Sequence, residues 1–266
     1  MEIKEVLLAF GLTLLAGLST TIGGIISVLK KKLNNKFLSS TLGFSAGVMI
    51  YVSLIDIFPK ARTSLEAVYG DSKGFWITTI AFFAGIGLIA LIDRFVPSVD
   101  NPHEIPDMVM ENCEVDRECL MRMGVFSALA IAIHNFPEGL ATFASALKDP
   151  ALGVSITIAV AIHNIPEGIA VAVPVLYATK SKAKAVGYAF LSGLSEPLGA
   201  VAGYFILRGI FNDTTFGIVF AAVAGIMIYI SLDELLPTAE KYGEHHIAMY
   251  GVISGMAVMA LSILLF

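Results

Sequence analysis

The sequence is poor in charge, in cysteine and in tryptophan. Charged residues make up 15% of its 266 positions, against roughly 25% in ordinary soluble domains. The net charge is only −5 and no strong basic patch is present, which argues against nucleic acid as a partner. The two cysteines, Cys113 and Cys119, are too few for a disulfide framework. These deficits argue against an ordinary soluble domain, a nucleic-acid binder and a disulfide-stapled fold.

Apolar side chains take the place of the missing charges. They account for 56% of the chain, and the mean hydropathy is +0.81, as in membrane proteins. A helix needs about 20 apolar residues to cross a bilayer, and several runs reach that length. These runs do not alternate in polarity as barrel strands do, so an all-α polytopic membrane protein is predicted. Eight transmembrane helices are expected, at residues 5–29, 38–59, 76–97, 122–147, 151–178, 184–208, 215–237 and 247–266.

The connections between these spans are expected to be short, apart from residues 60–75 and 98–121. Lys and Arg gather on one set of loops, which the positive-inside rule assigns to the cytoplasm. This places both termini outside an inner or plasma membrane, and it places the 98–121 loop in the cytoplasm. That loop carries His103 and the two cysteines among several acids. An acidic solvated loop is the favoured interpretation, and a metal-sensing loop is the alternative.

Two pairs of segments repeat within the chain. Residues 49–61 (MIYVSLIDIFPKA) match residues 227–239 (MIYISLDELLPTA) at seven of thirteen positions, and residues 18–24 resemble residues 194–200. The copies lie an odd number of spans apart, so they are expected to cross the membrane in opposite directions. Inverted repeats around polar segments are typical of secondary transporters.

The strongest motif is a polar run that occurs twice inside apolar spans, as HNFPEG at 134–139 and as HNIPEG at 163–168. Within each copy, the His, Asn and Glu are three or four residues apart and share one helix face. A carboxylate at that depth is costly unless it is paired, protonated or bound to a cation. No Lys or Arg lies at a similar depth in these spans, which leaves metal ions or protons as partners.

A proline lies in the middle of each motif. Pro137 and Pro166 cannot donate to the carbonyls of Ile133 and Ile162, which are freed within the membrane. Irregular backbone of this kind is tolerated where it lines a cavity, and the glycine that ends each motif permits close helix approach. The alternative is a helix start in a soluble protein, with Asn as N-cap and Glu in a capping box. Long apolar flanks on both sides weigh against that alternative.

The residue types in the two motifs select a class of cation. Imidazole, carboxylate and amide donors suit divalent ions such as Zn2+, Fe2+, Mn2+, Co2+ and Cd2+. Thiolates are absent, which disfavours copper(I), and Mg2+ or Ca2+ would not need imidazole. If the motifs meet, one site can form from two imidazoles and two carboxylates, those of His134, Glu138, His163 and Glu167. A second site can share the two glutamates and add two amides and one more carboxylate, those of Asn135, Asn164 and Glu196.

The paired HNFPEG and HNIPEG motifs, followed by SEPLGA at 195–200, resemble the ZIP (Zrt/Irt-like protein) family of divalent-metal transporters. The likeness covers nearly the whole chain and is strongest to the bacterial branch of the family. It implies a single transporter domain over residues 1–266, with eight helices in a 3+2+3 inverted-repeat arrangement. It also implies a binuclear metal centre midway along the transport path. The first site of this centre would consist of His134, Glu138, His163 and Glu167. The implied second site consists of Asn135, Glu138, Asn164, Glu167 and Glu196.

Acidic residues near the ends of two repeated spans are weaker candidates. Asp56 lies toward the outer end of one span, and Asp233 and Glu234 lie toward the inner end of another. They would act as an entrance and an exit relay for cations, or they are ordinary helix-end carboxylates exposed to water. A further group either accepts the departing metal or forms a solvated loop, and it comprises Glu240, Glu244, His245 and His246.

The leading hypothesis is a carrier, not an enzyme, that imports divalent metal, above all zinc, while two inverted halves rock around the central site. An intramembrane metalloenzyme is the runner-up, because His and Glu around a metal can activate water. The absence of an H-E-x-x-H motif and of a deep arginine for phosphate disfavours it. A metal-gated receptor without flux is the third hypothesis. The expected partners are divalent cations and the lipid bilayer, and a homodimer is compatible with the sequence.

Overall fold

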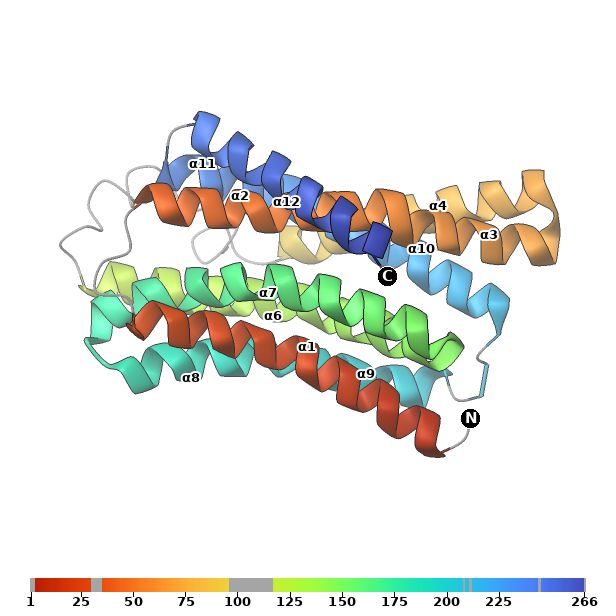
Figure 1. The fold of residues 1–266 in the computed structure, drawn as a ribbon, viewed down its shortest axis with the longest axis horizontal. Helices are drawn as coiled ribbons and strands as arrows, with labels where there is room; N and C mark the ends of the chain where they lie inside the picture. The colour runs from red at the N-terminus through yellow and green to blue at the C-terminus, as the bar shows by residue number, and fades with distance from the viewer. Residues whose placement is uncertain are drawn as a thin grey trace.

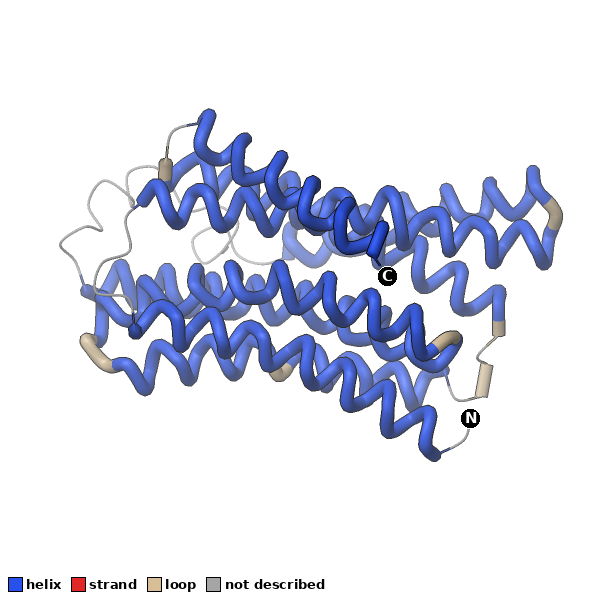
Figure 2. Tube along the Cα trace, viewed as in Figure 1, coloured by secondary structure: helices blue, strands red, loops and turns tan. Residues whose placement is uncertain are grey.

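The computed structural model describes residues 3–29, 35–95, 117–207, 209–210, 212–243 and 245–265. Within these ranges the regular structure is entirely helical, and short turns join the helices (Figure 2). The all-α class predicted from the sequence is confirmed. Seven helical units of the described ranges are long and apolar enough to cross a membrane. Large apolar side chains such as Leu15, Trp76 and Leu264 are exposed on the outside, as contact with lipid requires.

The helices form two bundles, which are the lower and upper layers of Figure 1. The first bundle contains the helices that pack around α6 and α7, namely α1 (Ile3–Leu29), α6 (Arg117–Lys148), α7 (Pro150–Thr179), α8 (Lys182–Gly193) and α9 (Ser195–Leu207). The second bundle contains α2 (Asn35–Val52), α3 (Phe58–Tyr69), α4 (Asp71–Phe95), α10 (Asp213–Ile230), α11 (Leu236–Tyr242) and α12 (His245–Leu265). The bundles meet chiefly where α2 packs against α7 and where α10 packs against α6.

The repeated segments do not form two separate halves of the molecule. The copies at 18–24 and 194–200 lie on α1 and around the start of α9, in the first bundle. The copies at 49–61 and 227–239 lie along α2–α3 and α10–α11, in the second bundle. Each repeat therefore contributes to both bundles. The main packing boundary runs between the bundles and not between the inverted halves that were expected to rock.

One predicted connection is wrong. Helices lie along each predicted span within the described residues, but residues 60–69 continue as helix α3 and do not form a loop. Pro59 lies in the first turn of α3, where a missing N–H leaves no bond unmade. The chain turns only at Gly70, whose φ of 80° favours glycine, and α4 begins at the next residue. As a result, α3 and α4 extend past the other helices at one end of the molecule (Figure 1). That all eight spans cross the bilayer stays a prediction.

Two π-helical segments occupy equivalent places in the second bundle. The segment η1 (Ser53–Ile57) joins α2 to α3, and η2 (Ser231–Leu235) joins α10 to α11. In each case the first residue of the next helix bonds to the carbonyl five residues back, and a proline follows directly. Single π-turns of this kind often occur at functional sites. They place one buried carboxylate at the same position of each segment, that of Asp56 and that of Glu234.

The helices α6 and α7 run through both motifs without interruption. Pro137 and Pro166 lie inside helix, so the asparagines before them are not N-caps, and the soluble helix-start alternative is wrong. The glycines that end the motifs touch neighbouring backbone. A Cβ on Gly139 would overlap the carbonyl of Glu196, and one on Gly168 would overlap the carbonyl of Thr20. The predicted close approach of helices at both glycines is confirmed.

Candidate metal centre

The two motifs meet because α6 and α7 form a tight antiparallel hairpin. Asp149 is the single residue between them, and its side chain accepts a hydrogen bond of 2.9 Å from the N–H of Ala151. Pro150 occupies the first turn of α7, where its missing N–H costs nothing. With so short a turn, residues equally distant from Asp149 lie level across the hairpin. His134 and His163 therefore come to nearly the same depth.

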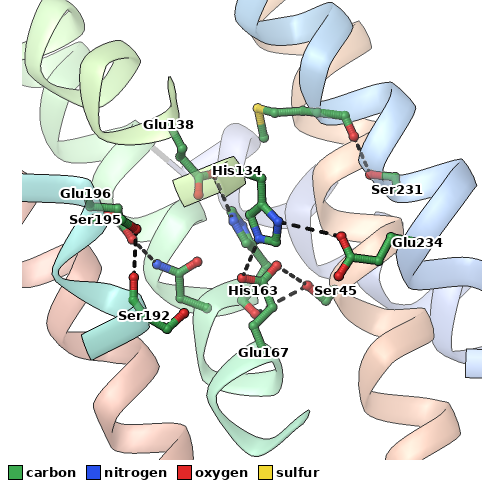
Figure 3. Close-up of polar contacts among 12 residues, drawn as sticks. Ser45, His134, Glu138, His163, Glu167, Ser192, Ser195, Glu196, Ser231 and Glu234 are labelled. Atoms are coloured by element: carbon green, nitrogen blue, oxygen red, sulfur yellow. Dashed lines mark hydrogen bonds and ion pairs between the residues drawn. The ribbon is translucent and has the colours of Figure 1, made fainter. Parts of the chain in front are cut away.

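Each histidine faces the glutamate of the opposite motif. His134 Nε2 and Glu167 Oε2 form a hydrogen bond of 3.1 Å, and His163 Nε2 lies 2.9 Å from Glu138 Oε1 (Figure 3). All four side chains are at most 3% exposed. The structure thus brings together the four residues predicted for the first site.

A contact with its own helix fixes which ring nitrogen of His163 carries the hydrogen. Its Nδ1 lies 3.0 Å from the carbonyl oxygen of Ala159, and because a carbonyl only accepts, Nδ1 carries the hydrogen. In a neutral imidazole, Nε2 then carries the lone pair, and this atom lies 2.9 Å from a carboxylate oxygen of Glu138. Two acceptors this close repel unless a proton or a metal ion lies between them. A backbone carbonyl that fixes the tautomer is also the usual support of a metal-binding histidine.

The residues predicted for the second site lie beside the first, within the first bundle. Asn164 Nδ2 donates to Glu196 Oε1 and, at 3.2 Å, to the carbonyl of Ala16 on α1. Asn135 is fully buried, and neither its Oδ1 nor its Nδ2 has a hydrogen-bond partner. Asn164 Oδ1 and Glu196 Oε2 also have none. Buried amide and carboxylate oxygens without partners are costly, so this group of oxygens fits a cation.

Two residues from the second bundle reach the centre. Ser45 on α2 donates to Glu167 Oε1 at 3.2 Å, and Glu234 on η2 places its Oε2 3.9 Å from His134 Nδ1 (Figure 3). Glu234 was singled out in the sequence only as a relay beyond the centre. Ser45 was missed, because an isolated serine among small and apolar residues carries no pattern.

The donors do not form a ready-made metal cage. Across the described ranges, no group of three His, Cys, Asp or Glu side chains is arranged to hold an ion. The imidazoles and carboxylates pair with one another instead. A metal ion would therefore enter by replacing the contacts between His134 and Glu167 and between His163 and Glu138.

Comparison with known proteins identifies the family. A family model described as ZIP Zinc transporter matches residues 103–263. The chain belongs to the ZIP family. Proteins named zinc transporter ZupT are similar to this ZIP chain over nearly its full length. The protein from Chlorobaculum parvum is 62% identical over 98% of both chains, and that from Clostridium perfringens is 59% identical over 100% of this chain and 98% of its own. A third, from Oceanobacillus iheyensis, is 60% identical over 98% of both.

Family membership decides between the classes of function. ZIP proteins are membrane transporters and not enzymes, so the intramembrane metalloenzyme hypothesis is ruled out. The resemblance to the bacterial branch of the ZIP family is confirmed by the ZupT relatives. The chain is accordingly a multi-pass membrane protein.

Apart from Glu234, the weaker candidates that the structure describes make no contact with the centre. Asp56 is paired with Lys60 at 2.6 Å, one turn along the helix, and Asp233 is exposed. At the end of α11, Glu240 contacts His245 Nδ1 at 2.6 Å, while His246 is exposed. Most of the 98–121 loop, with His103 and Cys113, lies outside the described residues, as does Glu244. The side chain of Cys119 is not described either.

Proposed function

We propose that this ZIP protein imports divalent transition-metal ions, with Zn2+ as its main cargo, into the cytoplasm. The observation that carries the proposal is the pair of buried histidine–glutamate contacts between antiparallel helices. In one of them, His163 Nε2 lies 2.9 Å from Glu138 Oε1, and neither atom has an aligned hydrogen bond. The names of the ZupT relatives support zinc as the cargo.

Two adjoining sites would hold the ions in transit. The first site would consist of His134, Glu138, His163 and Glu167. The second site would share both glutamates and add the buried oxygens of Asn135, Asn164 and Glu196, several of which have no hydrogen-bond partner. The mixed donors suit Zn2+, Fe2+, Mn2+, Co2+ and Cd2+. They suit Mg2+ and Ca2+ poorly, because those ions prefer oxygen alone.

The packing suggests which parts would move during transport. All seven proposed ligands belong to the first bundle, and the second bundle contacts them through Ser45 on α2 and Glu234 on η2. We therefore propose that alternating access is a movement of the first bundle against the second, and not a rocking of inverted halves. Both termini would face outward, as the distribution of Lys and Arg predicts.

Uptake into proteoliposomes tests the proposal. Native protein and Glu138→Ala would be compared with Zn2+, Fe2+, Mn2+, Co2+ and Mg2+ offered in turn. We expect Zn2+ uptake by the native protein and only background uptake by Glu138→Ala. Glu66→Ala is the matched control, because Glu66 is a surface carboxylate bonded to Arg62 at 2.6 Å. Native uptake by Glu138→Ala would refute the site, and metal binding without uptake would favour a receptor.

A further inference from the structure

The proposed first site is not closed by its own bundle. Ser45, on the facing helix α2, is fully buried, and its Oγ lies 3.2 Å from Glu167 Oε1 and 3.3 Å from the carbonyl oxygen of His163. Both contacts fall on the same turn of α7, the turn that carries a histidine and a glutamate of the site. The single hydroxyl hydrogen of Ser45 can therefore be donated to the carbonyl of His163 or to the carboxylate of Glu167, at the two ends of this turn (Figure 3).

This use of a hydroxyl differs from that of three other buried serines in the helices. Ser27, Ser145 and Ser231 each donate to a carbonyl four residues back in their own helix. Such local bonds satisfy the hydroxyl without any role for a neighbouring helix. Ser45 instead donates across the boundary between the two bundles, to a carboxylate 122 positions away.

The hydroxyl makes the two glutamates of the centre unequal. Glu167 is held on both oxygens, with Oε2 bonded to His134 and Oε1 bonded to Ser45. Glu138 approaches His163 at 2.9 Å, yet neither of its oxygens has an aligned hydrogen bond. One carboxylate of the centre is therefore fixed, and the other is free to turn toward an arriving ion.

We propose that Ser45 is a positioning residue of the metal centre, which holds the Glu167 carboxylate from the opposite bundle in the orientation that binds the cation. The proposal rests on the proposed function. An ion that displaces His134 from Oε2 would find the other oxygen still held by Ser45. Less side-chain freedom is then lost on binding, as with other outer partners that orient metal ligands.

The test compares Ser45→Ala with Ser39→Ala, using purified full-length protein and Zn2+. Ser39 is the matched control, because it is a fully buried serine of the same helix whose hydroxyl has no hydrogen-bond partner. We expect Ser45→Ala to weaken Zn2+ binding about tenfold, the lower end of the effect of outer partners on metal sites. We expect a similar rise in the KM of uptake, with Vmax within about twofold of native. Ser39→Ala should bind as the native protein does.

A conservative variant separates the hydroxyl from the shape of the side chain. Ser45→Thr keeps the hydroxyl and should bind Zn2+ more tightly than Ser45→Ala. Native affinity in Ser45→Ala would overturn the proposal, and so would a fall in Vmax with KM unchanged. Equal loss in folded Ser45→Ala and Ser45→Thr would overturn it as well.

The proposed function can fail independently of Ser45. Native uptake by Glu138→Ala would remove the metal site itself, and the Ser45 proposal would fall with it. An inactive Glu138→Ala beside a fully native Ser45→Ala would leave the site in place and overturn only the role of Ser45.

Discussion

The two bundles bury different chemistry. Among the described residues, every buried histidine and asparagine lies in the first bundle, together with the carboxylates of Glu138, Glu167 and Glu196. The second bundle buries the carboxylates of Asp56 and Glu234, both on π-helical segments, in a core built from large apolar side chains. This core includes Met49, Phe216 and Phe220. The comparison indicates that the buried imidazole and amide groups are concentrated in one bundle, while the other forms the surface that this bundle packs against.

The contrast teaches that a site in a membrane interior need not be shared equally between repeats. The repeated segments contribute to both bundles, but the duplicated HNxPEG motif lies in only one of them. The second bundle adds side groups at the edge of the centre, from α2 and η2. Substitutions can therefore disturb the ligands, the bundle that carries them or the boundary between bundles.

The largest effect should come from breaking the first bundle itself. Gly168→Val would drive a side chain into the carbonyl of Thr20, where backbone and not a flexible side chain must give way. We expect a loss of at least about 3 kcal/mol, the upper range for overpacking, and little folded protein after purification in detergent. Gly87→Val on α4 is the control, because nothing lies within 4 Å of the added Cβ. Monodisperse Gly168→Val with native melting temperature would contradict the close packing.

The next largest effect compares a proposed ligand of the first bundle with a side chain that the second bundle places beside the centre. We expect His163→Ala to weaken Zn2+ binding at least about a hundredfold, beyond the range of outer partners, and Glu234→Gln to weaken it by about tenfold or less. The reason is that His163 Nε2 lies within the donor pair, whereas Glu234 approaches His134 only to 3.9 Å. Calorimetric titration of the purified variants measures both values. Equal losses would mean that the second bundle supplies a full ligand.

The smallest effect concerns the boundary between bundles, far from the centre. Lys148 at the end of α6 contacts Ser64 Oγ at 2.6 Å and Asp213 Oδ1 at 2.9 Å, and so links α6 to α3 and α10. The Asp213 side chain is 61% exposed. A double-mutant cycle with Lys148→Ala and Asp213→Ala should therefore give a coupling of only about 0.2–1 kcal/mol. The coupling should shrink as salt is added. A larger coupling that does not depend on salt would show that this contact contributes substantially to holding the two bundles together.

Much of the fold and of the centre can be predicted from the sequence, because both depend on patterns among residues that are close together in the chain. Long apolar runs predict the helices, and polar residues three and four apart predict ligands on one helix face. The duplicated motif predicts a shared site if its two copies meet, and the structure brings His134 and His163 together across the one-residue turn at Asp149. Gly139 and Gly168 predict close helix contacts, because a residue without a side chain lets two helices approach each other.

The remainder could not be predicted, because it depends on contacts between distant segments. Ser45 acts on a residue 122 positions away, and nothing in its own neighbourhood marks it. The helix over 60–69 was missed because the spans were drawn by hydropathy, which falls where Lys60 and Arg62 follow the apolar run. No local sequence pattern predicts the division into two bundles either, because each inverted repeat places one of its segments in the first bundle and the other in the second.

The crossed pairing of the two motifs has a consequence for the direction of transport. Because α6 and α7 are antiparallel, the pair formed by His134 and Glu167 is related to the pair formed by His163 and Glu138 by an approximate twofold rotation. For these two pairs alone, an ion arriving from either side of the membrane would meet one histidine and one glutamate in a similar arrangement. These two pairs by themselves would not favour one direction of transport over the other. In the proposed transporter, the sign of net flux would be set by the ion gradient, and only the groups that break the rotation, such as Ser45, would make entry differ from exit.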